Sequence, residues 1–159
     1  MSDESKSYSF EHQRRVEFHE TDLAGIVHFS NFYRYMETAE HEFMRSLGHP
    51  VPQEMNEAEI GWPRVSASCE FRKPARHDDL LVIRVSIDEI RTHSVHYSFR
   101  FYLDPADAPI ATGTVAAACV KFENGSPAPA PIPDEIRADL EAARAGSAGK
   151  TQHRKGISE

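Results

Sequence analysis

The sequence predicts an α+β domain in which one long helix is wrapped by a curved antiparallel sheet of about five strands, followed by a short C-terminal helix. Two patterns lead to this prediction. Apolar residues recur every three or four positions over 30–47, and every two positions in several later segments between 65 and 122. A helix and a sheet that each have one apolar face bury those faces by packing together.

A weak strand signal precedes the helix at 9–18, where apolar residues stand among polar ones at Phe10, Val16 and Phe18. The helix signal is much stronger, with one apolar stripe formed by Phe32, Tyr35, Met36, Ala39, Phe43 and Leu47. Charged residues off this stripe predict a solvated face that includes Arg34, Glu37, Glu40, Glu42 and Arg45. We expect Ser30 or Asn31 to cap the start of the helix, and Gly48 to mark its end.

Four strands are expected after the helix, at 65–71, 81–87, 95–103 and 110–122. Short turns between them favour antiparallel pairing of consecutive strands. The segment 110–122 is rich in small residues, which lets a helix approach closely, so we place this strand beneath the long helix. Residues 124–133 are rich in proline and are predicted to be extended. A short helix then runs from Pro133 to Ala145, with Ile136 and Leu140 on its apolar side.

Size and composition indicate one soluble domain at 8–145, with flexible ends at 1–7 and 146–159. The chain has 159 residues and a net charge of −7, which argues against a nucleic-acid partner. It contains no apolar run long enough to cross a membrane and no apolar core of a signal peptide at its start. We therefore expect a cytoplasmic protein. Cys69 and Cys119 each lie in an apolar strand-like segment and are expected to be buried free thiols in a reducing cytoplasm. Their spacing fits no zinc site.

The candidate catalytic group is Asp22, in a glycine-containing turn a few residues before the long helix. The start of a helix offers unpaired backbone N–H groups and partial positive charge. A carboxylate beside such donors has two of the parts needed to attack a carbonyl and hold the resulting oxyanion. The arrangement predicts hydrolysis of an acyl compound.

Two sequence blocks resemble the hotdog fold, and specifically the 4-hydroxybenzoyl-CoA thioesterase family. The first block lies between His19 and Glu42 and matches at Asp22, Gly25, Val27, Asn31, Tyr35, Glu37 and Glu42. The second is CEFRKPARHDDLLVI, which contains Pro74, Ala75, Arg76, Asp78 and Asp79. With the later strands, the resemblance covers roughly residues 10 to 123.

This resemblance implies that Asp22 acts as nucleophile or as general base on water, without a metal, cofactor or prosthetic group. Backbone N–H groups at Val27 to Phe29 would be the oxyanion donors. Relatives of this type form dimers with sites at the subunit interface, often paired again, so a homodimer or dimer of dimers is expected. Many acyl-CoA thioesterases of the family carry histidine seven residues after the aspartate. Here that position is Phe29, and His28 precedes it. Relatives that act on aromatic acyl-CoA esters often carry an aromatic residue at this site, so the resemblance favours an aromatic acyl group.

Several residues near Asp22 have both a functional and a structural interpretation. Gly25 is a turn glycine that also leaves room for a thioester against the backbone. His28 is a candidate for polarising the carbonyl or protonating the thiol, or it is an ordinary solvated histidine. Asn31 is a candidate for orienting the attacking water molecule, and capping of the helix is its structural alternative. Glu37 is a second choice as catalytic carboxylate.

The predicted substrate contacts also have structural alternatives. Phe29, Phe32 and Trp62 are candidates for the acyl pocket, although core packing explains Phe32 equally well. Arg72, Lys73 and Arg76 form a dense basic cluster in an acidic chain. Such a cluster suits the phosphates of CoA, and it also suits a charged edge strand that resists aggregation.

The predicted function is hydrolysis of an acyl-CoA thioester to a free acid and CoA. The first rival is a hotdog dehydratase or hydratase acting on 3-hydroxyacyl or enoyl thioesters, for which His28 and Glu37 are the candidate groups. The second rival is a non-catalytic module that binds acyl-CoA.

Overall fold

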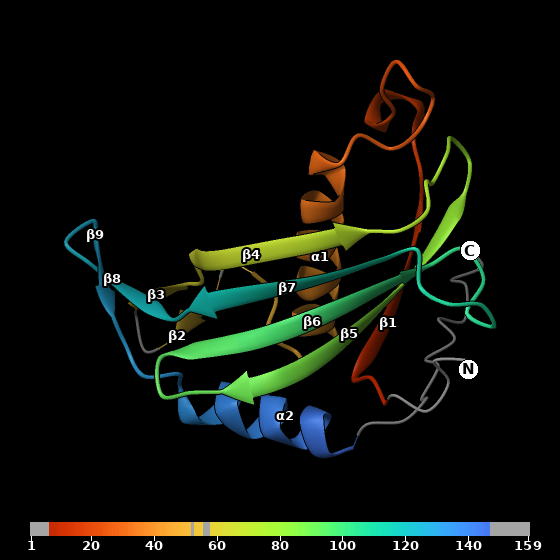
Figure 1. Ribbon diagram of the computed structural model, residues 1–159. Coiled ribbons are helices and arrows are strands. Elements are labelled where there is room, and N and C mark those ends of the chain that lie inside the picture. Colours follow the sequence, from red (N-terminus) through yellow and green to blue (C-terminus); the bar gives the residue numbers. More distant parts are fainter. Residues whose placement is uncertain (1–6, 52, 56–57, 147–159) are drawn as a thin grey trace, which may run out of the picture.

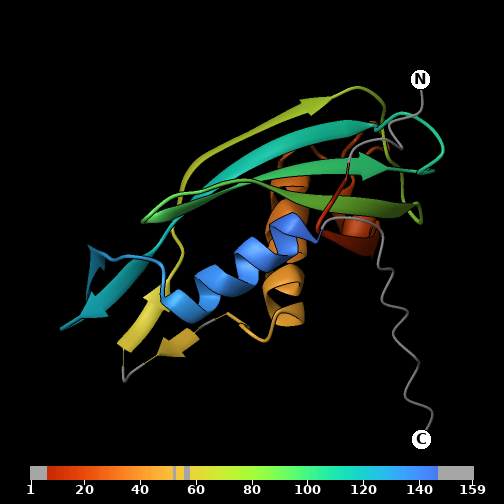
Figure 2. The same cartoon turned by 90° about the horizontal axis from the view of Figure 1, so that it is seen from below.

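The computed structural model describes residues 7–51, 53–55 and 58–146, and its main feature is a five-stranded antiparallel sheet that curves around the long helix α1 (Ser30–Ser46) (Figures 1 and 2). The strand order is β1 (Phe10–Arg15), β5 (Leu80–Ile90), β6 (Ser94–Tyr102), β7 (Ala111–Ala118) and β4 (Arg64–Phe71). This arrangement confirms the predicted α+β class. The predicted flexible ends lie almost wholly outside the described residues.

The predicted apolar stripe of α1 is buried against the concave face of this sheet. Phe32, Tyr35, Met36, Ala39 and Phe43 are each at most 4% exposed. At Gly113 of β7 the helix side chain comes so near that an added Cβ would lie 2.5 Å from Met36 Sδ. Only glycine leaves that space. The prediction that the small-residue strand lies beneath α1 is confirmed.

The second helix, α2 (Asp134–Ala145), packs beside β5 and buries the two predicted apolar residues, Ile136 and Leu140 (Figure 1). Its polar side is linked to the chain just after α1, because His49 Nε2 lies 2.7 Å from Asp139 Oδ2. Among the described residues, neither helix is long and apolar enough to cross a membrane.

A second, four-stranded sheet was not predicted from the sequence. Its order is β2 (Gln53–Met55), β3 (Ala58–Gly61), β8 (Val120–Glu123) and β9 (Ser126–Pro129). The predicted strand 110–122 is therefore two strands, and the predicted extended segment 124–133 begins with a hairpin. Asn124 and Gly125 both have positive φ, 51° and 78°, which is the tight turn that an Asn-Gly pair favours.

Three details of the prediction were wrong: the end of the first strand, the pairing of β4 with β5, and the cap of α1. The first strand ends at Arg15 and is followed by the 3₁₀ turn η2 (Phe18–Glu20). Consecutive strands β4 and β5 do not pair, because β4 pairs with β7 while β5 lies between β1 and β6. Neither Ser30 nor Asn31 caps α1, since the cap position is Phe29 and it carries no side-chain capping bond. Gly48, with φ of 86°, does follow the end of α1 as predicted.

Glu40 was predicted to face solvent, but it is 3% exposed. Its Oε2 accepts a hydrogen bond from Arg64 Nη2 at 2.6 Å, and Arg64 Nη1 donates to the carbonyl oxygen of Trp62 at 2.7 Å. Burial raises the pKa of Glu40 to about 7, although the Arg64 guanidinium opposes this shift. Glu40 thus forms a buried ion pair between α1 and the start of β4.

The edge strand β4 also differs from the prediction, which assigned it one buried face. Residues on both faces are exposed, including Val65 at 65% and Phe71 at 45%. Cys69 is only half-buried for the same reason, whereas Cys119 is buried; both are free thiols. Burial raises the pKa of each thiol to about 11, so neither is an activated nucleophile at neutral pH.

Candidate active site

The loop that carries Asp22 is a tight turn closed at its base. Thr21 and Val27 form an antiparallel bridge across it. The Asp22 N–H donates to the Ile26 carbonyl oxygen at 2.8 Å, and the Gly25 N–H donates to the Asp22 carbonyl oxygen at 2.9 Å. Gly25 has φ of 74°, a value that favours glycine. Because the loop doubles back, Asp22 lies beside the segment that enters α1.

The Asp22 side chain is partly buried and borders a cavity. Its Oδ1 accepts a hydrogen bond from the Ala24 N–H at 2.8 Å, while Oδ2 accepts none within the described part of the chain. His28 borders the same cavity, whose remaining lining residues are Phe18, His19, Thr21, Leu23, Ala24 and Gly25. One oxygen of the carboxylate is therefore available to a ligand in this cavity.

The three predicted oxyanion donors are not equivalent. The Val27 N–H donates to the Ala75 carbonyl oxygen at 2.8 Å, and the His28 N–H donates to the Glu20 carbonyl oxygen at 2.9 Å. The Phe29 N–H has no acceptor among the described residues. Phe29 occupies the cap position of α1, where an N–H is left unpaired and the helix dipole adds positive charge. The geometry leaves Phe29 as the free donor of the three.

The His28 ring is oriented by Ser30. Its Nδ1 lies 2.7 Å from Ser30 Oγ and accepts a hydrogen bond from the Ser30 N–H at 3.3 Å. A backbone N–H only donates, so Nδ1 is an acceptor and the neutral ring carries its proton on Nε2. The ring also packs against Phe29, with 4.8 Å between centroids. His28 is exposed, and its neutral form presents a donor to solvent or a ligand.

Of the three aromatic residues predicted to line an acyl pocket, only Phe29 is exposed, at 59%. Its ring lies edge-on to Phe71, at 6.4 Å between centroids. Phe32 is 4% exposed and contacts Phe71 and Phe101, each at 5.2 Å, while Trp62 is 7% exposed. Core packing accounts for Phe32 and Trp62. Phe71 was not singled out from the sequence, because it belongs to a strand whose neighbours the sequence does not reveal.

The predicted basic cluster is divided between two places. Arg76 pairs with Ile26 in a β-bridge, and its Nη1 lies 4.0 Å from where a Cβ of Gly25 would stand. Its guanidinium is therefore beside the Asp22 loop. Arg72 instead lines a cavity on the outer face of the sheet, together with Glu70 and Thr112. Lys73 is exposed in the segment after β4, and Glu37, the second candidate carboxylate, is exposed on α1.

A buried carboxylate that the sequence analysis missed supports the base of the loop. Glu20 is 5% exposed, its Oε1 accepts from the Glu17 N–H at 2.8 Å, and its Oε2 accepts from Arg14 Nη2 at 2.7 Å. Burial opposes ionisation, but the Glu17 N–H and the Arg14 guanidinium outweigh it and lower the pKa of Glu20. The Glu17-x-x-Glu20 spacing of a capping box was the available signal.

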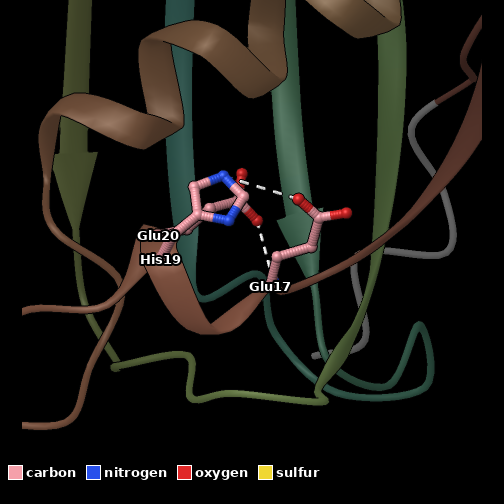
Figure 3. A group of neighbouring side chains, drawn as sticks. All are labelled: Glu17, His19 and Glu20. Carbon is pink, nitrogen blue, oxygen red and sulfur yellow. Dashed lines mark hydrogen bonds and ion pairs between the residues drawn. The ribbon is translucent and has the colours of Figure 1, made fainter.

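Glu17, His19 and Glu20 also bring three potential metal-binding atoms within 4.8 Å of one another (Figure 3). Two observations argue against a cation there. Both oxygens of Glu20 already accept hydrogen bonds, and the Arg14 guanidinium adds positive charge 3.6 Å from Glu17 Oε2. We interpret the group as structural: its hydrogen bonds and its ion pairs with Arg14 hold the base of the Asp22 loop in place.

Comparison with known proteins identifies the family. The model of the thioesterase-like superfamily matches residues 16–140, which include the Asp22 loop, the buried residues of both helices and strands β4 to β7 of the main sheet. The chain belongs to this superfamily. Membership confirms the resemblance stated from the sequence and the thioester-hydrolase class of the enzyme.

Individual relatives agree with the superfamily. A putative esterase of Aquifex aeolicus (strain VF5) is 38% identical over 90 residues, which are 57% of this chain and 70% of the relative. The 4-hydroxybenzoyl-CoA thioesterase of Pseudomonas sp. (strain CBS-3) is 36% identical over 84 residues, 52% of this chain and 60% of the relative. The structure of the gentisyl-coenzyme A thioesterase BH1999 is 34% identical, covers 82% of this chain and 99% of its own, and has a TM-score of 0.73. The hotdog fold of thioesterases is thus confirmed for this chain.

Proposed function

We propose that this thioesterase hydrolyses acyl-CoA to a free carboxylic acid and CoA, with Asp22 as its catalytic carboxylate. The observation that supports this most is that two polar groups without a hydrogen-bond partner in the described part of the chain lie on neighbouring segments, which are joined because the His28 N–H donates to the Glu20 carbonyl oxygen. Asp22 offers a carboxylate oxygen that accepts no hydrogen bond within the described residues, and Phe29 offers an N–H without an acceptor there. A thioester carbonyl placed between them would be polarised from one side and attacked from the other.

The proposed reaction begins when the thioester carbonyl oxygen accepts a hydrogen bond from the Phe29 N–H. Asp22 then either attacks the carbonyl carbon or removes a proton from a water molecule that attacks it. The tetrahedral intermediate carries negative charge on the former carbonyl oxygen, beside the positive end of α1. Its collapse re-forms the carbonyl, breaks the carbon–sulfur bond and releases CoA as a thiolate, which takes a proton from solvent or, in the general-base route, the proton held by Asp22. In the covalent route, water then hydrolyses the mixed anhydride at Asp22.

For the acyl group we propose an aromatic ring. The exposed Phe29 ring lies edge-on to Phe71 next to the proposed reacting centre, so the two rings offer an apolar aromatic surface. Two of the relatives reported above are named for 4-hydroxybenzoyl and gentisyl thioesters. His28 would present its Nε2–H to an acceptor oxygen of the substrate.

The dehydratase alternative is less well supported, because it requires a histidine that acts as a base. The Nδ1 of His28 already accepts from Ser30, and Nε2 carries the proton of the neutral ring. Glu37, its suggested partner, is an exposed residue of α1 outside the cavity that Asp22 and His28 share. Loss of enoyl absorbance from crotonyl-CoA without release of thiol would favour the dehydratase.

We also propose a homodimer, assembled again into a dimer of dimers. Strand β4 is an edge strand, exposed on both faces, and carries Val65 and Phe71. An unpaired edge with exposed apolar residues is a surface that a second copy can cover by continuing the sheet. Phe71 contacts Phe29, so such a partner would approach the proposed site. A monomeric mass in sedimentation analysis at working concentration would contradict this assembly.

The experiment that tests the function is a thiol-release assay with purified protein and short-chain, long-chain and aromatic acyl-CoA esters. We expect release of CoA thiol with all classes that fit the cavity and the highest kcat/KM with hydroxybenzoyl esters. Tight binding of these esters without thiol release would instead support a non-catalytic binding module.

The position of Arg76 predicts a role in CoA binding. We expect Arg76→Gln to raise KM for acyl-CoA several-fold with little change in kcat, because a cation beside the loop would attract the CoA phosphates. The matched control is Arg72→Gln, since Arg72 lies on the outer sheet face and should leave KM near the parent value. Steady-state kinetics at low and high salt measure both variants. An equal effect of the two substitutions would contradict this assignment.

A further inference from the structure

Asn31 makes a contact that neither capping nor water binding explains. Its Nδ2 donates to the carbonyl oxygen of Glu20 at 2.8 Å, across 11 residues of chain, and the side chain is partly buried. The same carbonyl oxygen accepts the His28 N–H at 2.9 Å. A carbonyl oxygen has two lone pairs, and both are used here, by one donor just before α1 and one in its first turn.

These two bonds join the segments that carry the proposed reacting groups. Glu20 stands two residues before Asp22, and the donors His28 and Asn31 stand on either side of Phe29. Together with the bond from the Asp22 N–H to the Ile26 carbonyl oxygen, these two bonds hold the loop that carries Asp22 against the segment that carries Phe29. The Glu20 side chain is held in turn by Arg14 and by the Glu17 N–H, so this carbonyl group is itself fixed in place.

We infer that Asn31 is a positioning residue, which holds the carboxylate loop against the first turn of α1 in the geometry needed for attack on the thioester. This inference rests on the proposed function. The Asn31 Nδ2 already donates to the Glu20 carbonyl oxygen, so Asn31 acts through the loop and not on the substrate. Displacement of a catalytic group by about 1 Å commonly lowers the rate about 10²-fold.

The test compares Asn31→Ala and Asn31→Asp with Thr38→Ala. Asn31→Asp keeps the shape of the side chain but removes the donor and places a negative charge against the Glu20 carbonyl oxygen. Thr38→Ala removes a different side-chain hydrogen bond of the same helix, from Oγ1 to the Arg34 carbonyl oxygen at 2.9 Å, away from the loop. Thiol release from an aromatic acyl-CoA gives kcat and KM, and thermal melting reports on the global fold.

We expect both Asn31 variants to lose about 10–100-fold in kcat with KM nearly unchanged, and Asn31→Asp to lose at least as much as Asn31→Ala. Thr38→Ala should keep the parent kcat, and all variants should melt cooperatively. Parent kcat in both Asn31 variants would overturn the inference. So would an equal loss of kcat in Thr38→Ala, which would indicate a general effect on the helix.

Amide hydrogen exchange keeps this result separate from the proposed function. If Asn31 anchors the loop, its replacement by alanine should speed exchange at the His28 N–H, which shares the acceptor, and at the Asp22 N–H, which closes the loop. Exchange within the centre of α1 should not change. This readout needs no substrate, so it stands even if the parent protein hydrolyses no thioester tested. Unchanged exchange at both amides would overturn the anchoring role.

Discussion

Replacement of Asp22 by asparagine is expected to lower kcat for thioester hydrolysis by about 10²–10⁴-fold, the usual contribution of a positioned acid–base group. Asparagine has the same shape as aspartate. Its Oδ1 can still accept the hydrogen bond that the Ala24 N–H donates to Asp22 Oδ1 at 2.8 Å. The loop should therefore keep its conformation. What is lost is the negative charge that attacks the carbonyl or deprotonates water. Thiol-release kinetics under single-turnover conditions measure the chemical step directly.

The control for this substitution is Glu37→Gln, which removes the second candidate carboxylate. Glu37 is exposed on α1 and does not border the Asp22 cavity, so this variant should retain nearly the parent kcat. Melting temperatures of both variants should stay close to that of the parent. If Glu37→Gln were the inactive variant and Asp22→Asn the active one, the catalytic carboxylate would lie on the helix and the proposed mechanism would be wrong.

Replacement of Arg64 by methionine is expected to destabilise the fold by about 3 kcal/mol or more at pH 8, because it leaves the buried Glu40 carboxylate without its cation. Methionine retains much of the apolar stem of arginine. It also removes Arg64 Nη1, which donates to the Trp62 carbonyl oxygen at 2.7 Å. Chemical denaturation measures the free energy of unfolding. The double variant Glu40→Met with Arg64→Met should recover most of the loss, since no charge remains buried.

The effect of Arg64→Met should also depend on pH. Burial holds the pKa of Glu40 at about 7 in the folded protein, above its ordinary value. As pH falls, Glu40 therefore takes up its proton at a higher pH in the folded state than in the unfolded state. The stability from that proton is fully present at low pH and is lost as pH rises through about 7. Without Arg64 the ionised form is disfavoured further. The destabilisation should thus be smaller at pH 5.5 than at pH 8, and equal losses at both would contradict a buried ionised Glu40.

The parts of the fold that follow local periodicity were predictable from the sequence. The stripe from Phe32 to Phe43 determines the buried face of α1, and small residues around Gly113 indicate where the helix meets the sheet. Both patterns arise from contacts that a single element imposes on its own sequence. The loop at Asp22 was predictable for a similar reason, because Gly25 supplies the positive φ that the turn requires.

Features that depend on distant partners were not predictable. Glu40 has the spacing of a solvated residue, and only Arg64, 24 positions away, makes its burial tolerable. Asn31 is a good helix cap by residue type, yet its side chain reaches back to Glu20. Of the predicted oxyanion donors, two already donate to Ala75 and Glu20. In each case the competing partner comes from another element, so the outcome depends on tertiary structure.

The central claim is that the Phe29 N–H holds the oxyanion formed when the Asp22 carboxylate acts on the thioester. Comparing Phe29→Pro with Phe29→Ala tests it most directly, because both remove the ring and only proline removes the N–H. The φ of Phe29 is −53°, a value that proline adopts. We predict that kcat of Phe29→Pro is about 10²–10³-fold below that of Phe29→Ala, at similar melting temperature. Equal kcat in the two folded variants would contradict the proposed oxyanion site.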